Sequence, residues 1–306
     1  MKINNCEKEK TLILTQTDPV EDTMFNSWIK SGLKADIIFK NVSKPLRFIR
    51  RIVANYLPYS FISTWLGDWK ETLGRYNTVI LHASELTSRI PQYIHSVNPK
   101  IRVIYWYWNP VNEKTNPSRL TDKNVELWTF NRKDQYKYNM NYNIQYYSGS
   151  IQASENNDIK YDVYFIGHDK GRKKFINKIK KLMESQNIKC KFSIISDNSK
   201  KFVPYNTVRK NLLSSKAVLE VNQDGQDGYT LRALESLFLK KKLITNNSSL
   251  KKADFFCEDN IYILCQNVSP SSIKKFINSP YNHKVDSFLH EYTIDSWFNN
   301  FFLERK

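Results

Sequence analysis

The chain has 306 residues, of which 41% are hydrophobic and 25% are charged, a composition that excludes an intrinsically disordered polypeptide. This length suggests about two domains of roughly 150 residues each. Residues 1–10 are mostly polar, and no apolar run reaches the roughly 18 residues that cross a bilayer. We therefore expect neither a signal peptide nor a membrane-spanning helix.

The formal net charge is +17 at pH 7, and lysine and arginine are spread over both halves of the chain. This surplus favours a polyanionic partner such as nucleic acid, an anionic membrane surface or a phosphorylated substrate, although a codon bias toward lysine and asparagine would also produce it. The cysteines lack the C-x-x-C spacing and the Cys/His clustering of metal sites, which predicts reduced thiols in a cytoplasmic protein.

Strands and helices alternate in the first half of the chain. The predicted strands cover residues 11–16, 35–39, 78–81 and 101–105, and the predicted helices cover 24–30 and 85–97. Short β-branched runs separated by helical segments are typical of a parallel, doubly wound sheet.

The same pattern restarts after a polar segment at 149–160, which is the predicted linker. Strands are expected at 161–166, 191–195, 217–221 and 242–245, and helices at 171–186, 206–213 and 230–239. We therefore expect two α/β domains, at 1–150 and 151–285. A helical segment at 286–306 is expected to pack back toward the first domain.

The turn after strand 161–166 has the composition of a phosphate site. It contains Gly167, Lys170, Gly171 and Arg172. Glycines at a strand-to-helix turn let a phosphate approach the backbone, and the start of the helix offers unpaired N–H groups. The two basic side chains can pair with a diphosphate. The alternative is a tight turn with solvated basic residues.

A second segment, NQDGQDGYTLRALE at 222–235, follows the strand at 217–221. Thr230 can cap the helix that begins there or hold a phosphate. Arg232 and Glu235 are three positions apart, so they lie on one helix face, where a carboxylate can accept hydrogen bonds from the vicinal hydroxyls of a ribose. The alternative is an ordinary amphipathic helix with a surface Arg–Glu pair.

Together with KLIT at 242–245 and NIY at 260–262, these segments resemble the donor-binding domain of GT-B glycosyltransferases from bacterial capsule, exopolysaccharide, O-antigen and lipopolysaccharide synthesis. YWNP at 107–110 and LWTFNRKD at 127–134 resemble recurring segments of the same enzymes, so the resemblance covers about residues 100–265. It implies two Rossmann-like, doubly wound domains that face each other across a cleft.

The resemblance also implies roles for individual residues. Glu235 would bind the ribose of a nucleotide-sugar donor, and Arg172 its diphosphate. The residues that would meet the sugar and the diphosphate are Asp227, Gly228, Tyr229 and Thr230. Asp227 and Glu235 have the spacing of the family's Glu-x7-Glu motif with Asp in the first place, which leaves the stereochemistry of transfer open.

Other glycosyltransferases hold a divalent cation with an Asp-x-Asp pair, and this sequence contains none. We therefore expect a metal-independent reaction without a cofactor, in which a helix dipole and basic side chains stabilise the departing nucleotide diphosphate. Asp18, after the first strand, and His82, after the strand at 78–81, are the candidate general bases of an inverting reaction. A histidine at such a position is also commonly structural.

A basic and aromatic segment occupies residues 44–69 and has no acidic residue before Asp68. Such a segment predicts contact with an anionic membrane surface, here the inner face of the plasma membrane. The residues expected to make this contact are Arg47, Arg50, Arg51 and Trp65. The alternative is a core helix with a basic outer face.

The leading interpretation is transfer of a sugar from a nucleotide-sugar, expected to be a UDP-sugar, to a polyprenyl-diphosphate-linked glycan. The protein would be cytoplasmic and peripheral on the inner membrane surface. Two alternatives remain open: a nucleotide-sugar epimerase on the same architecture, and a basic non-enzymatic protein that binds membrane or nucleic acid. Because the sequence has no zinc-finger, RNP-like or helix-turn-helix signal, we expect no nucleic-acid partner.

Overall fold

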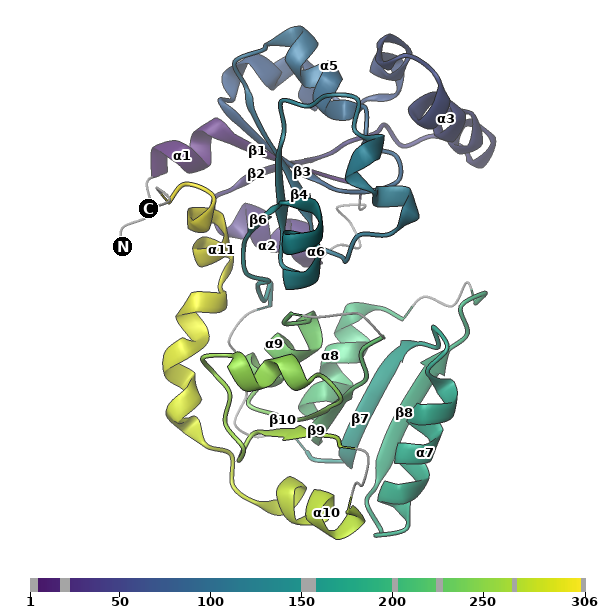
Figure 1. The fold of residues 1–306 in the computed structure, drawn as a ribbon, viewed down its shortest axis with the longest axis vertical. Coiled ribbons are helices and arrows are strands. Elements are labelled where there is room, and N and C mark those ends of the chain that lie inside the picture. Colours follow the sequence, from purple (N-terminus) through teal and green to yellow (C-terminus); the bar gives the residue numbers. More distant parts are fainter. Residues whose placement is uncertain are drawn as a thin grey trace. The chain divides into compact units, whose positions relative to one another are not determined.

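The computed structural model describes residues 5–16, 23–149, 158–199, 203–223, 228–265 and 269–303. The chain divides into two compact units (Figure 1). Unit 1 comprises Met1–Ile144 with Trp297–Lys306, and unit 2 comprises Gln145–Ser296. The predicted linker at 149–160 falls mostly outside the described residues.

Within its described residues, unit 1 has a sheet of parallel strands in the order β2-β1-β3-β4-β5-β6. The strands are β1 (Thr11–Thr15), β2 (Lys34–Ile37), β3 (Thr78–His82), β4 (Arg102–Tyr107), β5 (Glu126–Thr129) and β6 (Asn141–Tyr142). The α-helices are α1 (Asn5–Lys10), α2 (Thr23–Lys30), α3 (Lys44–Tyr56), α4 (Trp69–Thr72), α5 (Ile90–Val97) and α6 (Arg132–Tyr138). Short 3₁₀ helices are η1 (Tyr59–Trp65), η2 (Leu73–Arg75), η3 (Glu113–Thr115) and η4 (Pro117–Arg119).

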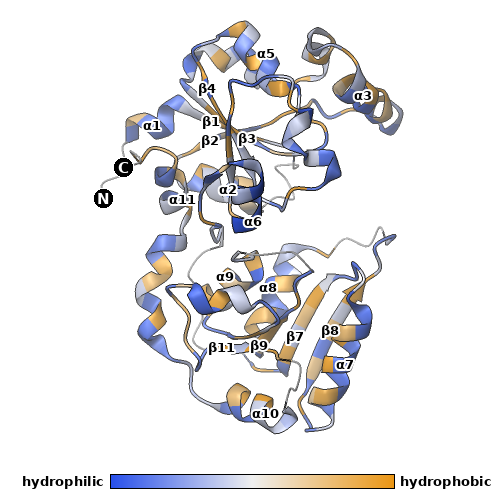
Figure 2. Ribbon diagram, viewed as in Figure 1, coloured by the Kyte–Doolittle hydropathy of each residue, from blue (hydrophilic) through white to orange (hydrophobic). Residues whose placement is uncertain are grey.

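Alternate residues of the unit 1 strands pack on opposite faces of the sheet. Tyr105 of β4 belongs to a core shared with α4 and α5. Its neighbour Trp106 instead meets Trp297 and Phe301 near the C-terminus, with ring centroids 6.0 and 5.8 Å apart. β1 and β3 are buried along their whole length, because parallel strands are covered on both faces. This explains the uninterrupted apolar runs in the sequence, which appear as hydrophobic strands in Figure 2.

The described part of unit 2 contains a second parallel sheet, in the order β11-β10-β9-β7-β8. Its strands are β7 (Tyr161–His168), β8 (Cys190–Ile195), β9 (Ser215–Glu220), β10 (Lys242–Thr245) and β11 (Ile261–Ile263). Its helices are α7 (Lys173–Glu184), α8 (Tyr205–Leu213), α9 (Leu231–Phe238), α10 (Pro270–Asn278), η5 (Ser248–Lys252) and η6 (His283–Tyr292). The helix α11 (Ile294–Asn300) follows η6.

Both faces of the unit 2 sheet are also covered. Val163 and Phe165 of β7 pack with α7 and α10 on one face. Tyr164, which lies between them in the sequence, packs with α8 on the other face. The connections around β7 change direction: β8 lies on one side of it, and β9, β10 and β11 follow on the other. Such a switch point leaves a crevice at the carboxyl ends of the strands.

The predicted fold class, α/β with two parallel sheets, is confirmed. The predicted start of the helix at 85–97 is wrong, because α5 begins at Ile90. The hydroxyl of Thr87 accepts a hydrogen bond from the backbone N–H of Ser84 at 2.9 Å and bonds the hydroxyl of Tyr105 at 2.7 Å. These bonds hold the preceding residues in a turn, and Pro91 suits the first turn of the helix that follows.

Candidate functional site

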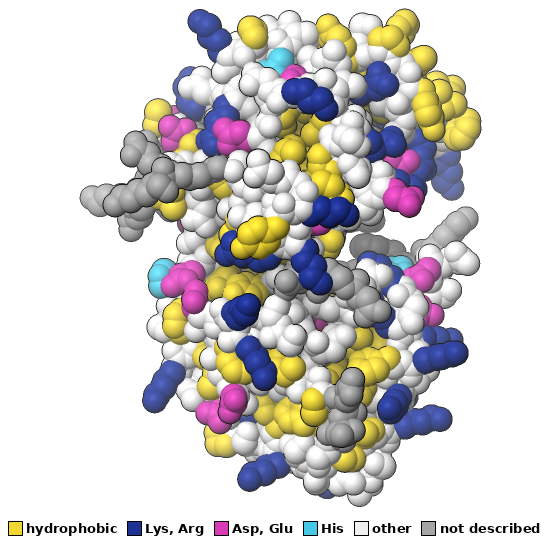
Figure 3. Space-filling model, in the orientation of Figure 1, with side chains coloured by type: hydrophobic (Ala, Val, Ile, Leu, Met, Phe, Trp, Pro, Cys, Tyr) yellow, Lys and Arg dark blue, Asp and Glu magenta, His cyan; other side chains and the backbone are white. Residues whose placement is uncertain are grey.

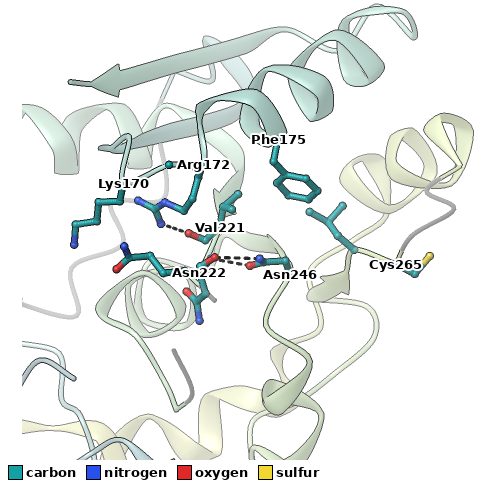
Figure 4. A pocket seen from close by; sticks show the side chains of 10 residues that line it. Lys170, Arg172, Phe175, Val221, Asn222, Asn246 and Cys265 are labelled. Carbon is teal, nitrogen blue, oxygen red and sulfur yellow. Dashed lines mark hydrogen bonds between the residues drawn. The ribbon is translucent and has the colours of Figure 1, made fainter. Parts of the chain in front are cut away.

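A cavity of about 850 Å³ lies at the carboxyl ends of the unit 2 strands, and we call it the carboxyl-edge pocket (Figure 4). Its walls come from the segments that follow β7, β9, β10 and β11, and from the start of α7. The lining residues are Lys170, Gly171, Arg172, Phe175, Val221, Asn222, Gln223, Asn246, Leu264 and Cys265. The pocket therefore sits at the switch point of the sheet, where the two directions of winding meet.

The turn after β7 has an unusual backbone. Lys170 and Gly171 have φ angles of 45° and 78°, a left-handed conformation that glycine adopts at no steric cost. The backbone N–H of Lys170 donates to the Asp197 carboxylate at 2.9 and 3.0 Å, and the N–H of Lys173 donates to Asp169 at 2.8 Å. Two donors of the predicted phosphate turn are therefore already bonded to carboxylates.

Arg172 joins the turn to the end of β9. Its guanidinium donates to the carbonyls of His168 at 2.6 Å and Asp169 at 3.2 Å, and also to the carbonyl of Val221. Burial lowers the pKa of this guanidinium, while nearby carboxylates raise it. In this conformation Arg172 shapes the wall of the pocket by binding backbone carbonyls. Its predicted contact with a diphosphate stays a prediction.

Asn222 and Asn246 connect the ends of β9 and β10. The backbone N–H of Asn222 donates to the Asn246 side-chain oxygen at 2.7 Å, and the Asn246 amide nitrogen donates back to the Asn222 carbonyl at 3.2 Å (Figure 4). The side-chain nitrogen of Asn222 is buried and has no hydrogen-bond partner among the described residues. Asn222 begins the predicted segment 222–235 but had no role assigned from the sequence, and Asn246 was not predicted at all, although an asparagine after a buried strand is a recognisable signal for a polar group at the sheet edge.

Thr230 is the N-cap of α9, and its hydroxyl accepts a hydrogen bond from the backbone N–H of Ala233 at 3.4 Å. The same hydroxyl donates to the carboxylate of Glu220, the last residue of β9. Because Val221 follows Glu220 and accepts a bond from Arg172, both predicted phosphate segments reach the end of the same strand. Glu220 was not predicted from the sequence, although an acidic residue in an otherwise apolar strand marks it.

Glu235 is buried, with its side chain 2% exposed, and pairs with Arg232 at 2.5 Å between Nη1 and Oε2. The prediction that these two residues share a helix face is confirmed, and the alternative of a surface ion pair is wrong because the carboxylate lies inside the unit. Burial raises the pKa of Glu235, while Arg232 and the hydroxyl of Tyr205 act in the opposite direction. Glu235 does not line the carboxyl-edge pocket, and its predicted contact with a ribose stays a prediction.

The remaining residues of the second motif are partly described. The carbonyl of Gly228 accepts a hydrogen bond from the Asn247 side chain at 3.0 Å. The Tyr229 ring packs against Phe255 and Tyr292, with centroids 5.3 and 6.0 Å apart. Asp227 lies outside the described residues. Gly167, on β7, has the Arg172 side chain near its Cα, and a Cβ there would lie 3.8 Å from that guanidinium.

In unit 1, Asp18 lies outside the described residues. His82 ends β3 and is buried between the rings of Trp28 and Trp108, whose centroids lie 5.1 and 5.4 Å from its own. Burial lowers the pKa of His82 to about 3, so its imidazole is neutral near pH 7. Its Nε2 atom has no hydrogen-bond partner within the described part of this unit. A role for either residue as a base stays a prediction.

The predicted membrane segment forms α3 and η1, and its arginines have intramolecular partners. Arg47 donates to Asn41 and to the carbonyl of Val42, at 3.0 and 2.9 Å. Arg51 forms an ion pair with Glu85 at 2.6 Å.

Arg50, the third of these arginines, donates to the Lys40 carbonyl at 2.9 Å and lies 4.8 Å above the Phe39 ring. Trp65 is half-buried and packs against the core.

The outward face of α3 and η1 is largely apolar, and we call it the α3 surface. Its exposed large side chains are Leu46, Phe48, Ile49, Ile52, Tyr56, Leu57 and Phe61. Phe48, Tyr56 and Phe61 are 67%, 78% and 57% exposed, whereas the buried residues of α3 are Val53 and Ala54. The alternative of a core helix with a basic outer face is therefore wrong. Figure 3 shows these hydrophobic side chains gathered at the upper right, beside Lys and Arg side chains.

Two features of other protein classes are absent from the described residues. Across these ranges, no helix combines the length and the apolar character that crossing a bilayer requires. In the same part of the chain, no three His, Cys, Asp or Glu side chains are grouped in a way that could hold a metal ion.

No protein-family model matches the chain, and neither does any curated protein. Among solved structures, the chain is similar to AviGT4, a glycosyltransferase involved in avilamycin A biosynthesis, with a TM-score of 0.53 and 10% identity over 95% of each chain. It is also similar to Alr3699/HepE of Anabaena in complex with UDP and glucose, with a TM-score of 0.52 and 8% identity over 96% of this chain and 98% of that one. These likenesses show the fold, which is that of GT-B glycosyltransferases.

The buried Glu235 predicts a specific pH dependence of stability. Because its pKa is raised in the folded state, its contribution to stability is complete below the ordinary pKa of a glutamate and is lost as the pH rises through the raised value. Glu235→Gln removes this titration, so the variant should lose less stability than the wild type as the pH rises above the ordinary pKa of a glutamate. Urea unfolding at several pH values measures this slope. Glu184→Gln, on the exposed side of α7, is the control, and equal slopes for Glu235→Gln and the wild type would contradict the prediction.

Proposed function

We propose that this protein is a glycosyltransferase that moves a sugar from a nucleotide-sugar, specifically a UDP-sugar, to an acceptor. The observation that carries the proposal is the carboxyl-edge pocket, where the turn after β7 and the segment after β9 meet at the switch point of the unit 2 sheet. The fold also supports the proposal, because HepE has a similar fold and was solved in complex with UDP and glucose.

The pocket offers two kinds of surface to such a donor. Lys170 is exposed at its rim and can approach the diphosphate, while the buried side-chain nitrogen of Asn222 can donate a hydrogen bond to it. Phe175 and Leu264 provide apolar surface for a planar base. In this proposal the charge of the departing UDP is stabilised by these donors and by the N-terminal end of α9.

Ribose binding by Glu235 requires a local rearrangement. In this structure its carboxylate forms an ion pair with the Arg232 guanidinium. A ribose would have to replace that partner. If Arg232 turned away from Glu235, its charge would be available to the diphosphate while the carboxylate accepted bonds from the two hydroxyls. We propose this exchange of partners as the way in which the motif binds the donor.

Binding of UDP is the first test of this proposal. The wild type should show a rise in thermal unfolding midpoint with UDP and none with uridine alone, because the diphosphate supplies the charge. Arg172→Ala, which removes three bonds to backbone carbonyls at the pocket wall, should weaken UDP binding about tenfold, or about 1.4 kcal/mol. Lys174→Gln, on the exposed side of α7, is the control for charge. A wild type that does not respond to UDP would contradict the proposed function.

We further propose that transfer needs no metal and no cofactor, because basic groups and a helix N-terminus take the place that an Asp-x-Asp-bound cation has in other glycosyltransferases. Turnover with a UDP-sugar and a lipid-linked acceptor should persist in EDTA at a rate within about twofold of the untreated enzyme. Mass analysis of the products measures it. Loss of activity in EDTA that manganese restores would contradict metal independence. Conversion of the donor sugar without any acceptor would instead indicate an epimerase.

The acceptor we propose is a polyprenyl-diphosphate-linked glycan at the inner surface of the plasma membrane, in bacterial surface polysaccharide synthesis. The α3 surface supports this proposal. An exposed cluster of aromatic and aliphatic side chains is costly in water and is typical of a membrane or protein contact. Lys44 and Arg51 flank it, and such cations complement anionic headgroups. The contact would thus rest on inserted rings, with the arginines of α3 in a secondary role.

Vesicle binding separates the contribution of the exposed apolar side chains from that of the arginines. Phe48→Ser combined with Tyr56→Ser should weaken binding to anionic phosphatidylglycerol vesicles about tenfold, because each removes exposed apolar area from the contact. Arg51→Gln should have a smaller effect that disappears at high salt. Tyr136→Ser, which removes an aromatic side chain that is 80% exposed on α6, is the matched control. Co-sedimentation measures each affinity, and unchanged binding of the double variant would exclude the α3 surface as the contact.

A further inference from the structure

Glu220 is a carboxylate in a place that favours apolar side chains. It is the last residue of β9, where Ala217, Val218 and Leu219 are buried, and it is itself only 4% exposed. Removing a carboxylate from water is unfavourable unless strong hydrogen bonds replace the lost hydration. The contacts of Glu220 should therefore explain why an acid is present there.

Each carboxylate oxygen of Glu220 accepts a hydrogen bond from a threonine hydroxyl. Thr230, the N-cap of α9, donates to one oxygen. Thr245, the last residue of β10, donates to the other at 2.5 Å. Burial raises the pKa of Glu220, and the two hydroxyls and the charges of Arg232 and Arg172 act in the opposite direction. The carboxylate thus links the end of β9 to the N-cap of α9 and to the end of β10.

The two hydroxyls extend this link to the backbone. Thr230 accepts from the N–H of Ala233 in the first turn of α9. Thr245 accepts from the N–H of Asn247 at 3.0 Å, and the Asn247 side chain donates to the carbonyl of Gly228 at 3.0 Å. Both ends of the segment from Gly228 to Thr230 are therefore tied to Glu220, one directly and the other through Thr245 and Asn247.

This arrangement lies directly behind the carboxyl-edge pocket. Val221, the next residue, accepts a hydrogen bond from Arg172 through its carbonyl, and both residues line the pocket. Glu220 does not line it. Any movement of its carboxylate would be transmitted to the pocket wall through Val221 and to the start of α9 through Thr230.

We propose that Glu220 is a positioning residue for the donor site, which holds the N-terminus of α9 and the segment from Gly228 to Thr230 in the orientation that receives the donor diphosphate. This inference rests on the proposed function. Glu220 does not contact the donor. It acts by accepting hydrogen bonds from the Thr230 and Thr245 hydroxyls, which orients their lone pairs toward the backbone N–H groups of Ala233 and Asn247.

Amide and hydroxyl variants test the link. Glu220→Gln keeps the volume but presents an NH₂ group to one of the two hydroxyls. That hydroxyl must then accept instead of donate, so its charge-assisted bond to the carboxylate is lost and its proton has to find another acceptor. Thr230→Val removes the hydroxyl that donates to Glu220, and Thr230→Ser retains that hydroxyl. We expect the dissociation constant for UDP to rise about tenfold in Glu220→Gln and in Thr230→Val, and to stay within about twofold of the wild type in Thr230→Ser. The double variant should be no weaker than the single ones, because both remove one interaction.

Ser215→Ala is the control for a merely structural effect. Ser215 lies at the opposite end of β9, is fully buried, and donates to the Leu212 carbonyl at 2.8 Å. Its variant should lower the thermal unfolding midpoint without changing UDP affinity. Titration calorimetry is done at a temperature where every variant is folded. If Glu220→Gln does not fold, the comparison of Thr230→Val with Thr230→Ser decides.

The outcomes separate the two proposals. A wild type that binds UDP together with Glu220 and Thr230 variants that bind it equally well would overturn the positioning role and leave the proposed function intact. Additive losses in the double variant would also overturn it, since they would mean that Glu220 and Thr230 act independently. A wild type that fails to bind UDP would overturn both.

Discussion

The unit 2 site depends on how the carboxyl ends of parallel strands satisfy their polar groups. Where a ladder ends, backbone carbonyls and N–H groups lose their partners and must find others or face water. Here side chains supply them: Arg172 binds the Val221 carbonyl, Asn246 binds both backbone groups of Asn222, and Asn247 binds the Gly228 carbonyl. The pocket is therefore surrounded by a network that fixes its walls before any ligand arrives, which lowers the entropy that binding must overcome.

This network also determines which charges remain for a ligand. Arg172 was predicted to meet a diphosphate, but its donors are directed to three carbonyls, and the start of α7 is partly occupied by Asp169. The net charge of +17 therefore contributes little inside the pocket. Of the two basic residues that line it, Lys170 and Arg172, the second acts mainly as a crosslink between backbone segments. Specificity in such a site would come from a few oriented donors, and the net charge of the protein would contribute mainly to the rate of encounter with an anion.

The sequence predicted the elements of the fold better than the contacts of the site. Buried parallel strands produce apolar runs that can be read directly, as for residues 11–16 and 78–81. The start of α5 was missed because it depends on hydrogen bonds of Thr87 with Ser84 and Tyr105, and the last of these lies on another strand. The bond from Arg172 to Val221 and the bonds of Glu220 with Thr230 and Thr245 were likewise unpredictable, because only the folded sheet brings these residues together. Helical periodicity placed Arg232 and Glu235 on one face. It did not indicate how deeply that face is buried.

The α3 surface illustrates the same limit and shows what the arginines contribute. Periodicity indicates that a helix has an apolar stripe and a basic stripe, but not which stripe faces the protein. In the structure the basic stripe is bound: Arg47 and Arg50 hold the segment at residues 40–42, and Arg51 pairs with Glu85. Because these bonds fix the rotation of α3, Phe48 and Tyr56 are left projecting into solvent. A helix held by its cations presents its apolar side chains in a fixed orientation, and a fixed cluster loses less conformational entropy on contact than a mobile one. In the proposed membrane contact, the arginines would thus act indirectly, through the geometry that they impose on their apolar neighbours.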